Sequence, residues 1–525
     1  MYCVELSLRK RKDGKVGSLE SRVLGDAPQE TFDLYLRHVH DFGARWDDKR
    51  RCHLTPALYA VDFLNTLARA RLRLSYTMEA DRWVSLQKVS RSLRLSAARE
   101  RVVDANARLA GSGVQLTKEQ AEGVEWLSCR RSALLSDTVG FGKTAQLLLA
   151  CPEGARVLVV TTASSIGAWG EEVKKWRPEF EFTSKVGLDC FIPGTVCAVS
   201  WSSALAHFGG LDERCVVIGD EAHKLKNRKS QRHQRFRELA HDVLHAGGTV
   251  WTATGTPLLN KPTELWNLLS AVQLERFAFG NWETFVNAFG GEQGDFGLEW
   301  GKPSPFASAK FERVALRRVA NFAEPRRRTL LVREYTREVK LALDECSRAL
   351  DRLGLRNSDD VLERLDSPSF HEVTHTRVLL SHFKCAAVRE LLDSYEEQEE
   401  PVVVFASFLG PVRELAQREG WSSIDGSVPA HKRTERIAAF QAGKLRGLVV
   451  LSEAGGEAIT LTRAAHCVFV DLPWTYGLLE QCEGRLIRKG QTRTVTVTYV
   501  QVDHPFERHV SDVIERKKQL AGATQ

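Results

Sequence analysis

The sequence predicts an α/β fold of two lobes, each built on a parallel β-sheet with helices on both faces. Short apolar runs alternate with helical stretches from about residue 115 to residue 270, and the same rhythm resumes after residue 399. This alternation is typical of parallel strands joined by crossover helices. A chain of 525 residues also suits about three domains rather than one.

The pattern divides the chain into four regions. Residues 1–105 combine an opening β-hairpin with helical stretches, and we expect them to form a small α+β accessory domain. We expect the first lobe to span residues 106–270 and the second lobe residues 399–525. Between them, the charged, helix-rich residues 271–398 are expected to form a helical insertion and linker.

Composition narrows the class of protein. Lys and Arg number 74 against 67 Asp and Glu, a net charge of +7 that permits a polyanionic partner without demanding one. The 11 cysteines form no C-x-x-C pair, which argues against a zinc ribbon or a disulfide framework and favours a reducing compartment. The sequence carries no apolar run of the roughly 18 residues that a membrane span needs, so we expect an intracellular protein without a membrane partner.

A basic run near the N-terminus, RKRKDGK, allows two interpretations. It could be a nuclear address. Asp13 and Gly14, however, lie between two alternating segments, and such a dipeptide favours the tip of a β-hairpin. We favour the hairpin.

The segment LSDTVGFGKT, residues 135–144, has the pattern of a phosphate-binding loop. It follows an apolar strand and precedes a helix, so backbone N–H groups around Gly140 and Gly142 and the helix N-terminus would face anionic oxygens. Lys143 could reach the β- and γ-phosphates, and the Thr144 hydroxyl could ligate Mg²⁺. ATP with Mg²⁺ is therefore the expected cofactor.

A pair of carboxylates follows about eighty residues later, at the end of the apolar strand in VVIGDEAH. Asp220 could hold Mg²⁺ through water, and Glu221 could orient the attacking water. Together with the phosphate loop, this pair predicts ATP hydrolysis.

The order of the motifs resembles the Swi/Snf-type helicase-like ATPases of superfamily 2, over about residues 115–515. The resemblance implies two RecA-like lobes with MgATP in the cleft and DNA across the top. Beside the two motifs above, it rests on QAEGVEWL at 120–127, VVTTASSIGAW at 159–169, TGTPLLN at 254–260, VVFASF at 403–408, DGS at 425–427, SEAGGEAITLT at 452–462 and QCEGRLIRKGQ at 481–491.

The resemblance also implies roles for single residues around ATP. Gln120 resembles the glutamine that reads the adenine edge, which an amide can do because it both donates and accepts. Arg485 and Arg488 resemble arginines that cross the lobe interface to the γ-phosphate, where planar guanidinium groups suit the charge of the transition state. Their spacing of three residues predicts that both lie on one face of a helix.

Further residues are expected at the nucleic acid. Ser164, Thr256 and Ser407 would contact phosphates together with nearby backbone N–H groups, which positions a backbone without reading sequence. Trp474 either lies against the DNA groove or is a half-buried tryptophan that closes the lobe. Beside these contacts, the segment containing Thr254 and Gly255, together with Gln481, is expected to couple hydrolysis to the grip on DNA.

The chain departs from the family at several positions. Asp137 replaces the first glycine of the general phosphate-loop pattern, as is usual in the Swi/Snf branch. Glu453 stands where that branch usually has arginine, and Thr475 and Tyr476 replace its usual Asn-Pro. The changes at Glu453, Thr475 and Tyr476 fall in the second lobe and leave the phosphate-binding residues intact.

The first region carries a weaker likeness. Its segment FDLYLRHVHDFGARWDDKRRCHLTP, residues 32–56, is similar to the small substrate-recognition domain of the HepA-related annealing helicases. That likeness implies a role in recognising DNA structure; the alternative is a brace packed on the first lobe.

The sequence therefore predicts a DNA translocase that hydrolyses ATP on duplex or forked DNA and remodels DNA structures or protein–DNA complexes. The alternatives are a strand-separating helicase and a non-hydrolysing nucleic-acid-binding scaffold. We expect a monomer as the minimal active form and leave protein partners open. The expected location is the nucleus for a eukaryotic source and the cytoplasm for a bacterial or viral one.

Overall fold

The computed structural model describes most of the chain. The described residues are 2–112, 115–138, 140–184, 191–203, 210–257, 261–294, 297–318, 324–352, 368–455, 459–488, 490–504, 507–508, 510–512, 514–515 and 518.

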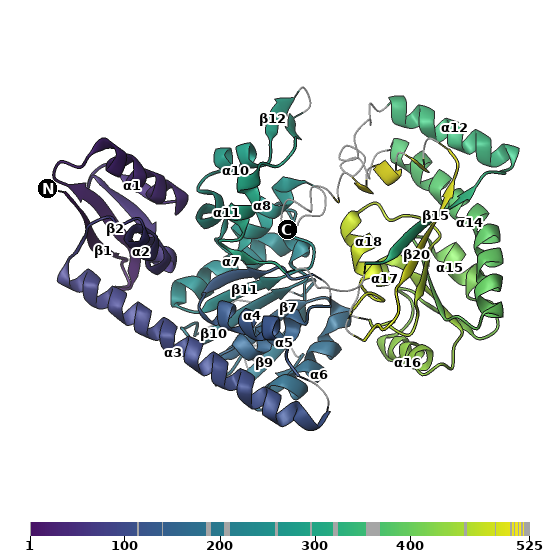
Figure 1. The fold of residues 1–525 in the computed structure, drawn as a ribbon, viewed down its shortest axis with the longest axis horizontal. Coiled ribbons are helices and arrows are strands. Elements are labelled where there is room, and N and C mark those ends of the chain that lie inside the picture. The colour runs from purple at the N-terminus through teal and green to yellow at the C-terminus, as the bar shows by residue number, and fades with distance from the viewer. Residues whose placement is uncertain are drawn as a thin grey trace.

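The first lobe is built on one sheet with the order β14-β6-β11-β10-β7-β9-β8, seven strands within the described residues, all paired in parallel (Figure 1). Its strands are β6 (Ser132–Leu135), β7 (Arg156–Thr161), β8 (Glu181–Thr183), β9 (Thr195–Ser200), β10 (Cys215–Asp220), β11 (Thr249–Ala253) and β14 (Ala315–Leu316). The helices around it include α4 (Lys118–Ser128), α5 (Lys143–Ala150), α6 (Ile166–Trp176), α7 (Gln231–Ala246) and α8 (Pro262–Ala271).

The central strands of this sheet are buried on both faces. In β7, Val157 and Val159 pack into the cluster that contains Trp169 of α6, and the alternate residues Leu158 and Val160 pack into the cluster on the other face. Successive side chains of a strand point to opposite faces, so a continuous apolar run requires cover on both sides. The continuous apolar run of β7 therefore explains why helices cover both faces of this sheet.

The second lobe repeats the architecture with the order β15-β20-β19-β16-β18-β17, six parallel strands within the described residues. Its strands are β15 (Arg326–Val332), β16 (Val402–Ala406), β17 (Trp421–Ile424), β18 (Gly447–Leu451), β19 (His466–Phe469) and β20 (Thr496–Val502). Its helices include α12 (Arg337–Arg352), α14 (Pro368–Glu397), α15 (Leu409–Leu415), α16 (Ala430–Gln441), α17 (Ser452–Gly455) and α18 (Tyr476–Glu483).

The segment between the two predicted lobes contributes to both sheets. It contains helices α9 (Glu275–Phe279), α10 (Trp282–Ala288) and α11 (Pro305–Phe311) and the antiparallel pair β12 (Gly291–Gly294) and β13 (Gly297–Trp300). Beyond them, β14 joins the first sheet and β15 joins the second. The domain boundaries stated above stay predictions.

The N-terminal region is a separate α+β unit with the sheet order β3-β4-β2-β1-β5. Its elements are β1 (Cys3–Lys10), β2 (Val16–Leu24), α1 (Gln29–Asp41), β3 (Arg45–Asp47), β4 (Cys52–Pro56), η1 (Ala57–Tyr59), α2 (Ala60–Arg69), β5 (Leu74–Tyr76) and α3 (Met78–Leu109). Strands β1 and β2 form the predicted hairpin, with Gly14 in the turn at a φ of 80°. The 32-residue helix α3 then runs along the first lobe (Figure 1).

The predicted fold class is confirmed: two lobes with parallel sheets between helices, and a small α+β unit ahead of them. Among the described residues, no helix is both long enough and apolar enough to cross a membrane.

Candidate functional site

The phosphate loop connects the end of β6 to the start of α5. Gly140 and Gly142 have φ values of 86° and 72°, a left-handed conformation that glycine adopts without steric cost. A Cβ atom added to Gly142 would lie 2.4 Å from the Gln120 amide nitrogen, so the loop also needs glycine for space. Gln120 donates from that nitrogen to the Phe141 carbonyl at 3.1 Å. The predicted adenine-reading residue therefore lies against the loop. Val139 lies outside the described residues.

Lys143 begins α5 and turns its amine back over the loop. Its Nζ donates to the main-chain oxygens of Asp137 and Thr138 at 2.8 and 3.2 Å. Burial lowers the pKa of Lys143, and the charges of Glu221 and Asp137 oppose that shift. A buried amine held only by carbonyls can exchange them for phosphate oxygens, so the cradle fits a phosphate chain.

Asp137 anchors the loop to a distant arginine. Its side chain is fully buried and forms a bidentate ion pair with Arg318, with Nε to Oδ1 at 3.0 Å and Nη2 to Oδ2 at 2.5 Å. The Arg318 guanidinium also donates to Gln146 of α5 at 2.7 Å and lies 4.8 Å from the Phe141 ring centroid. The residue that replaces the usual glycine is thus a fixed acceptor. No pattern in the sequence pointed to Arg318, which stands 181 positions away.

Arg317, the neighbour of Arg318, joins the loop to a second turn. Its guanidinium donates to the carbonyl of Ser136 at 3.1 Å and to the carbonyl of Gly255 at 3.0 Å. Burial lowers the pKa of Arg317, and the charge of Glu480, in the second lobe, opposes that shift. Arg317 therefore connects the phosphate loop with the predicted coupling segment, a role that sequence reasoning missed.

The predicted carboxylate pair lies at the carboxyl end of β10. Asp220 Oδ2 accepts hydrogen bonds from Thr161 Oγ1 at 3.0 Å and from Trp169 Nε1 at 2.9 Å. Glu221 follows at φ 50° and ψ 49°, a left-handed conformation that is uncommon for a residue with a side chain. Burial acts to raise the pKa of Glu221, but the hydrogen bond from His223 and nearby positive charges outweigh it and lower the pKa to about 2. Glu221 is therefore an ionised acceptor at neutral pH.

A series of polar contacts leads from Glu221 to the second lobe. His223 Nδ1 lies 3.3 Å from Glu221 Oε2 and 3.4 Å from Thr254 Oγ1. The Thr256 amide donates to that same hydroxyl at 3.2 Å, and Gln481 Nε2 of α18 donates to Thr256 Oγ1 at 3.4 Å. Of the residues predicted for coupling, Thr254 and Gln481 thus lie in one series of contacts across the lobe interface, joined by Thr256. Their role stays a prediction.

One cavity of about 150 Å³ brings the predicted ATP-site residues together, except Gln120, which is not among its lining residues. Both lobes line it: Gly140, Gly142, Lys143, Thr144, Ser165, Ala168, Trp169, Glu172, Asp220, Glu221 and Gly255 come from the first, and Gln481, Arg485 and Arg488 from the second. The phosphate loop, the carboxylate pair and the two arginines therefore face one space.

The prediction that Arg485 and Arg488 share one face of a helix is wrong. Helix α18 ends at Glu483 with Gly484 as its C-cap, and both arginines follow in turns. Glycine is a poor helix former, which favours a helix end at this position, before the arginines. Arg488 instead donates to the Ile459 carbonyl at 3.0 Å and to Thr460 Oγ1 at 2.9 Å. Burial and the neighbouring Arg485 charge together lower its pKa to about 10, and both cations line the cavity.

The same cavity contains oxygen ligands that fit Mg²⁺. The Thr144 hydroxyl and the Asp220 carboxylate both line it, and Mg²⁺ prefers such ligands and keeps several positions for water and phosphate. Among the described residues, no group of three or more His, Cys, Asp or Glu side chains could hold a metal ion. Thr144 and Asp220, beside the phosphate loop, fit an ion that nucleotide phosphates would help to hold.

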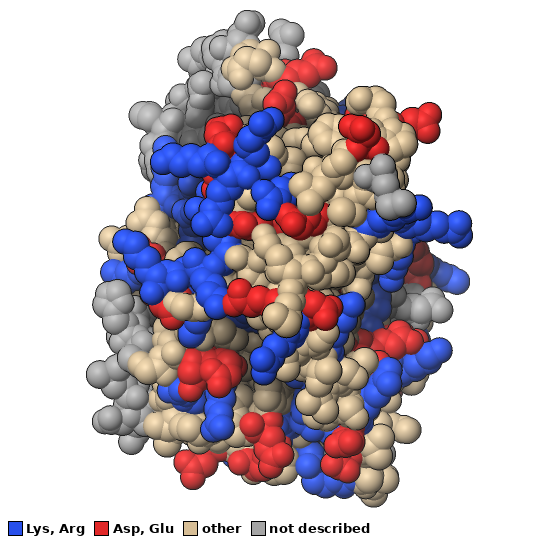
Figure 2. Space-filling model, turned by 90° about the vertical axis from the view of Figure 1, so that its left-hand side faces the viewer, with Lys and Arg blue, Asp and Glu red and all other residues tan. Residues whose placement is uncertain are grey.

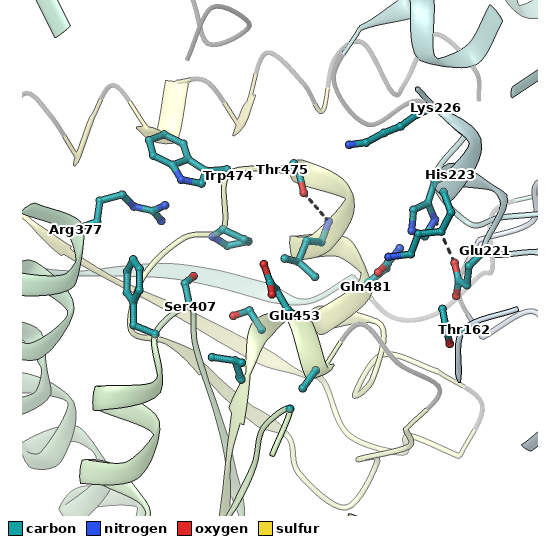
Figure 3. Close-up of a pocket in the computed structure, with 18 of the residues that line it drawn as sticks. Thr162, Glu221, His223, Lys226, Arg377, Ser407, Glu453, Trp474, Thr475 and Gln481 are labelled. Atoms are coloured by element: carbon teal, nitrogen blue, oxygen red, sulfur yellow. Dashed lines mark hydrogen bonds and ion pairs between the residues drawn. The ribbon is translucent and has the colours of Figure 1, made fainter. Parts of the chain in front are cut away.

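A wider cavity of about 740 Å³ opens beside the ATP pocket, between the lobes (Figure 3). It is lined from the first lobe by Thr162, Glu221, His223, Lys224 and Lys226, and from the second by residues that include Arg377, Ser407, Arg433, Glu453, Trp474 and Gln481. Glu221 and Gln481 line both cavities, so the two spaces adjoin at these residues.

Of the predicted nucleic-acid residues, Ser407 and Trp474 line that wider cavity. Trp474 is half-buried, and the Arg377 guanidinium lies 4.2 Å from its ring centroid. The Ser407 amide donates to Asp471 at 2.6 Å, while its buried hydroxyl has no hydrogen-bond partner among the described residues. Thr256 is 3% exposed and lies behind the cavity, at Gln481. The Ser164 side chain lies outside the described part of the chain.

Comparison with protein families finds two matches in chain order. Residues 203–359 match the SNF2-related domain, and residues 384–490 match the helicase conserved C-terminal domain. The chain is therefore an SNF2-type helicase-like ATPase. The first match begins after the phosphate loop, so the assignment of Lys143 and Thr144 depends on the geometry described above.

Curated relatives of this SNF2-type ATPase extend the likeness over most of the chain. It is 27% identical to the SWI/SNF-related matrix-associated actin-dependent regulator of chromatin subfamily A-like protein 1 homolog of Caenorhabditis elegans, over 74% of this chain and 59% of that protein. It is 24% identical to the DNA annealing helicase and endonuclease ZRANB3 of Bos taurus, over 74% of this chain and 38% of that protein. The chain thus spans less than two thirds of the length of each of these relatives.

A solved structure, the SWI2/SNF2 ATPase core of Sulfolobus solfataricus in complex with dsDNA, is 18% identical, with a TM-score of 0.36. The alignment covers 78% of this chain and 92% of that one.

Proposed function

We propose that the chain is a DNA-dependent ATPase that moves on duplex or forked DNA and remodels DNA structures or protein–DNA complexes. The observation that carries the proposal is the cavity in which the phosphate loop and carboxylate pair of one lobe face two arginines of the other. An ATPase completed by both lobes converts hydrolysis into relative lobe movement.

The residues around the cavity support a defined division of roles. Lys143 and the loop amides would hold the β- and γ-phosphates, Gln120 the adenine edge, and Thr144 and Asp220 the Mg²⁺ ion, which neutralises phosphate charge. Glu221, ionised and oriented by His223 at 3.3 Å, would position the attacking water. Arg485 and Arg488 would stabilise the charge that develops on the transferred phosphoryl group.

The wider cavity supports a nucleic-acid path next to this site. Four Lys and Arg side chains line it, Lys224, Lys226, Arg377 and Arg433, and both lobes contribute. Ser407 and Trp474 line the same space, and Ser164 and Thr256 remain candidates for phosphate contacts. A DNA backbone bound across both lobes would feel each closure through Gln481, Thr256 and Thr254.

The test is steady-state ATP hydrolysis with no nucleic acid, single-stranded DNA, blunt duplex and forked DNA of equal phosphate count. We expect duplex or forked DNA to stimulate hydrolysis more than single strands. Binding should weaken steeply with salt, because phosphate contacts release counterions. Absence of stimulation by any DNA would contradict the proposal.

The alternatives predict other outcomes of the same test. A strand-separating helicase would respond most to single-stranded DNA. A non-hydrolysing scaffold would show no turnover in any arm, and the presence of Lys143, Glu221 and both arginines in one cavity disfavours it. The monomeric form and a nuclear location in a eukaryotic source belong to the proposal and are tested by light scattering and by imaging.

A further inference from the structure

A second large cavity, of about 580 Å³, lies between the N-terminal region and the first lobe. The hairpin tip of β1 and β2, the start of α2 and the middle of α3 form one wall. The other wall is formed by the residues ahead of β6, the end of α7, and Phe277 of α9. Arg131 and Ser132 lie at the amino end of β6, whereas the phosphate loop follows its carboxyl end. The cavity is therefore at the opposite edge of the sheet from the ATP pocket.

The lining of this cavity is strongly positive. Among its described lining residues, Asp62 is the one carboxylate, against seven Lys and Arg residues. These are Arg11, Lys15, Arg91, Arg94, Arg130, Arg131 and Arg313. Asp62 forms an ion pair with Arg91 at 2.8 Å, so its charge is already balanced by one of these cations.

Most of the remaining cations are held by neutral groups rather than by carboxylates. Arg131 donates to the Gly248 carbonyl at 3.1 Å, Arg130 to the Trp126 carbonyl at 3.1 Å and Lys15 to the Ala246 carbonyl at 3.0 Å. Carbonyl oxygens fix the positions of these side chains but do not neutralise their charge. Arg11 is partly compensated by Asp13 at 3.4 Å, but most of the positive charge is preorganised by neutral groups, which favours an anion.

Among these cations, Arg94 has the surroundings that point most directly to a bound anion. It projects from α3 into the cavity wall, and its Nε is buried with no hydrogen-bond partner among the described residues. Burial lowers the pKa of Arg94, and the neighbouring Arg91 charge acts in the same direction. A guanidinium that is partly desolvated beside other cations is costly unless a ligand supplies the missing acceptor.

We propose that this cavity binds a phosphate-bearing ligand through Arg94 and the surrounding arginines. Guanidinium groups match the oxygens of phosphate in a bidentate geometry. The half-buried Trp83 also lines the cavity and offers apolar surface to a base or sugar. The phosphate can belong to a nucleic-acid backbone or to a free phosphate compound, and the site does not depend on ATP hydrolysis.

Binding in this cavity has to be distinguished from attraction to positive charge elsewhere on the surface. The end of the molecule formed by the N-terminal region carries several groups of Lys and Arg side chains among acidic ones (Figure 2). Arg82 provides the matched control, since it lies on the same helix but is exposed and does not line the cavity. Arg82→Gln and Arg94→Gln remove the same charge from α3.

The experiment measures alkylation of Cys129, a half-buried thiol that lines the cavity, by peptide mass spectrometry of the full chain. One arm contains inorganic pyrophosphate and the other a short single-stranded oligonucleotide, both against sodium chloride of equal ionic strength. Pyrophosphate bound in the phosphate loop would not shield Cys129, because that loop follows the other end of β6.

We expect at least one phosphate probe to slow alkylation in the parent chain and in Arg82→Gln. In Arg94→Gln the concentration for half-maximal protection should rise on the order of tenfold, and Arg94→Lys should recover part of it. Protection by pyrophosphate assigns a free phosphate compound, and protection by the oligonucleotide alone assigns a nucleic-acid backbone. No protection in either arm, or equal protection in Arg94→Gln with an unchanged unfolding midpoint, would overturn the proposal.

Discussion

The two sides of the ATP pocket are built differently. On the first-lobe side, Lys143, Asp137 and Arg318 are tied to one another within that lobe, with the Asp137–Arg318 pair at 2.5 Å. On the second-lobe side, Arg488 is held by its own lobe and reaches the cavity across the interface. Under the proposed function, this difference means that nucleotide binding is preformed in one lobe, while hydrolysis also needs the arginines of the other.

The largest expected effect comes from removing an arginine on the second-lobe side of the pocket. Arg488→Ala should reduce DNA-stimulated ATP turnover on the order of 10³-fold, because the transition-state charge loses its partner from the second lobe. Arg493→Ala is the matched control, since Arg493 is exposed and pairs with Glu400 outside the cavity. If Arg488→Ala kept full DNA stimulation of ATP turnover, measured by phosphate release, the role of Arg488 would be structural rather than catalytic.

Glu221→Gln should lower turnover by about 10²-fold or more while MgATP binding is kept. The amide preserves size and hydrogen bonding to His223 but cannot act as the carboxylate that polarises water. Single-turnover kinetics and equilibrium binding of MgATP separate the two effects. A parallel loss of affinity would mean that Glu221 holds the site together rather than positioning water.

Arg318→Ala should act on binding rather than on chemistry. Loss of its ion pair frees Asp137 and Gln146, so the KM for ATP should rise about tenfold with a smaller change in kcat. Arg318→Lys keeps the charge but not the bidentate fork, and should fall between the parent and Ala. Arg333→Ala, at an exposed residue away from the pocket, is the control. A KM within twofold of the parent, with an unchanged unfolding midpoint, would contradict this role.

The same comparison explains what the sequence could predict. Gly140, Gly142, Lys143 and Thr144 act within one turn, so a short motif determines their geometry. The burial of apolar strands such as β7 follows from continuous hydrophobic runs, and the two-lobed fold was predictable for that reason. The hairpin at Gly14 was predictable for a similar reason, because its turn depends on residues that are adjacent in the sequence.

Contacts between distant segments were not predictable. Arg318 reaches Asp137 across 181 positions, and a single sequence contains no signal that pairs them. His223 was visible only as part of a motif, and its contacts with Glu221 and Thr254 depend on how two loops meet. The helix expected through Arg488 failed because Gly484 ends α18 earlier than the residue spacing suggested.

The measurement that tests the division between the lobes most directly is the equilibrium Kd of MgATP for Lys143→Ala and Arg488→Ala, determined side by side in the full chain. Both variants should lose turnover. The account predicts that Lys143→Ala weakens MgATP binding by about tenfold or more, because a charged hydrogen-bond donor to the phosphates is lost, while Arg488→Ala stays within about twofold of the parent. An equal loss of affinity in both variants would contradict it, since the second lobe would then be required for binding as well as for catalysis.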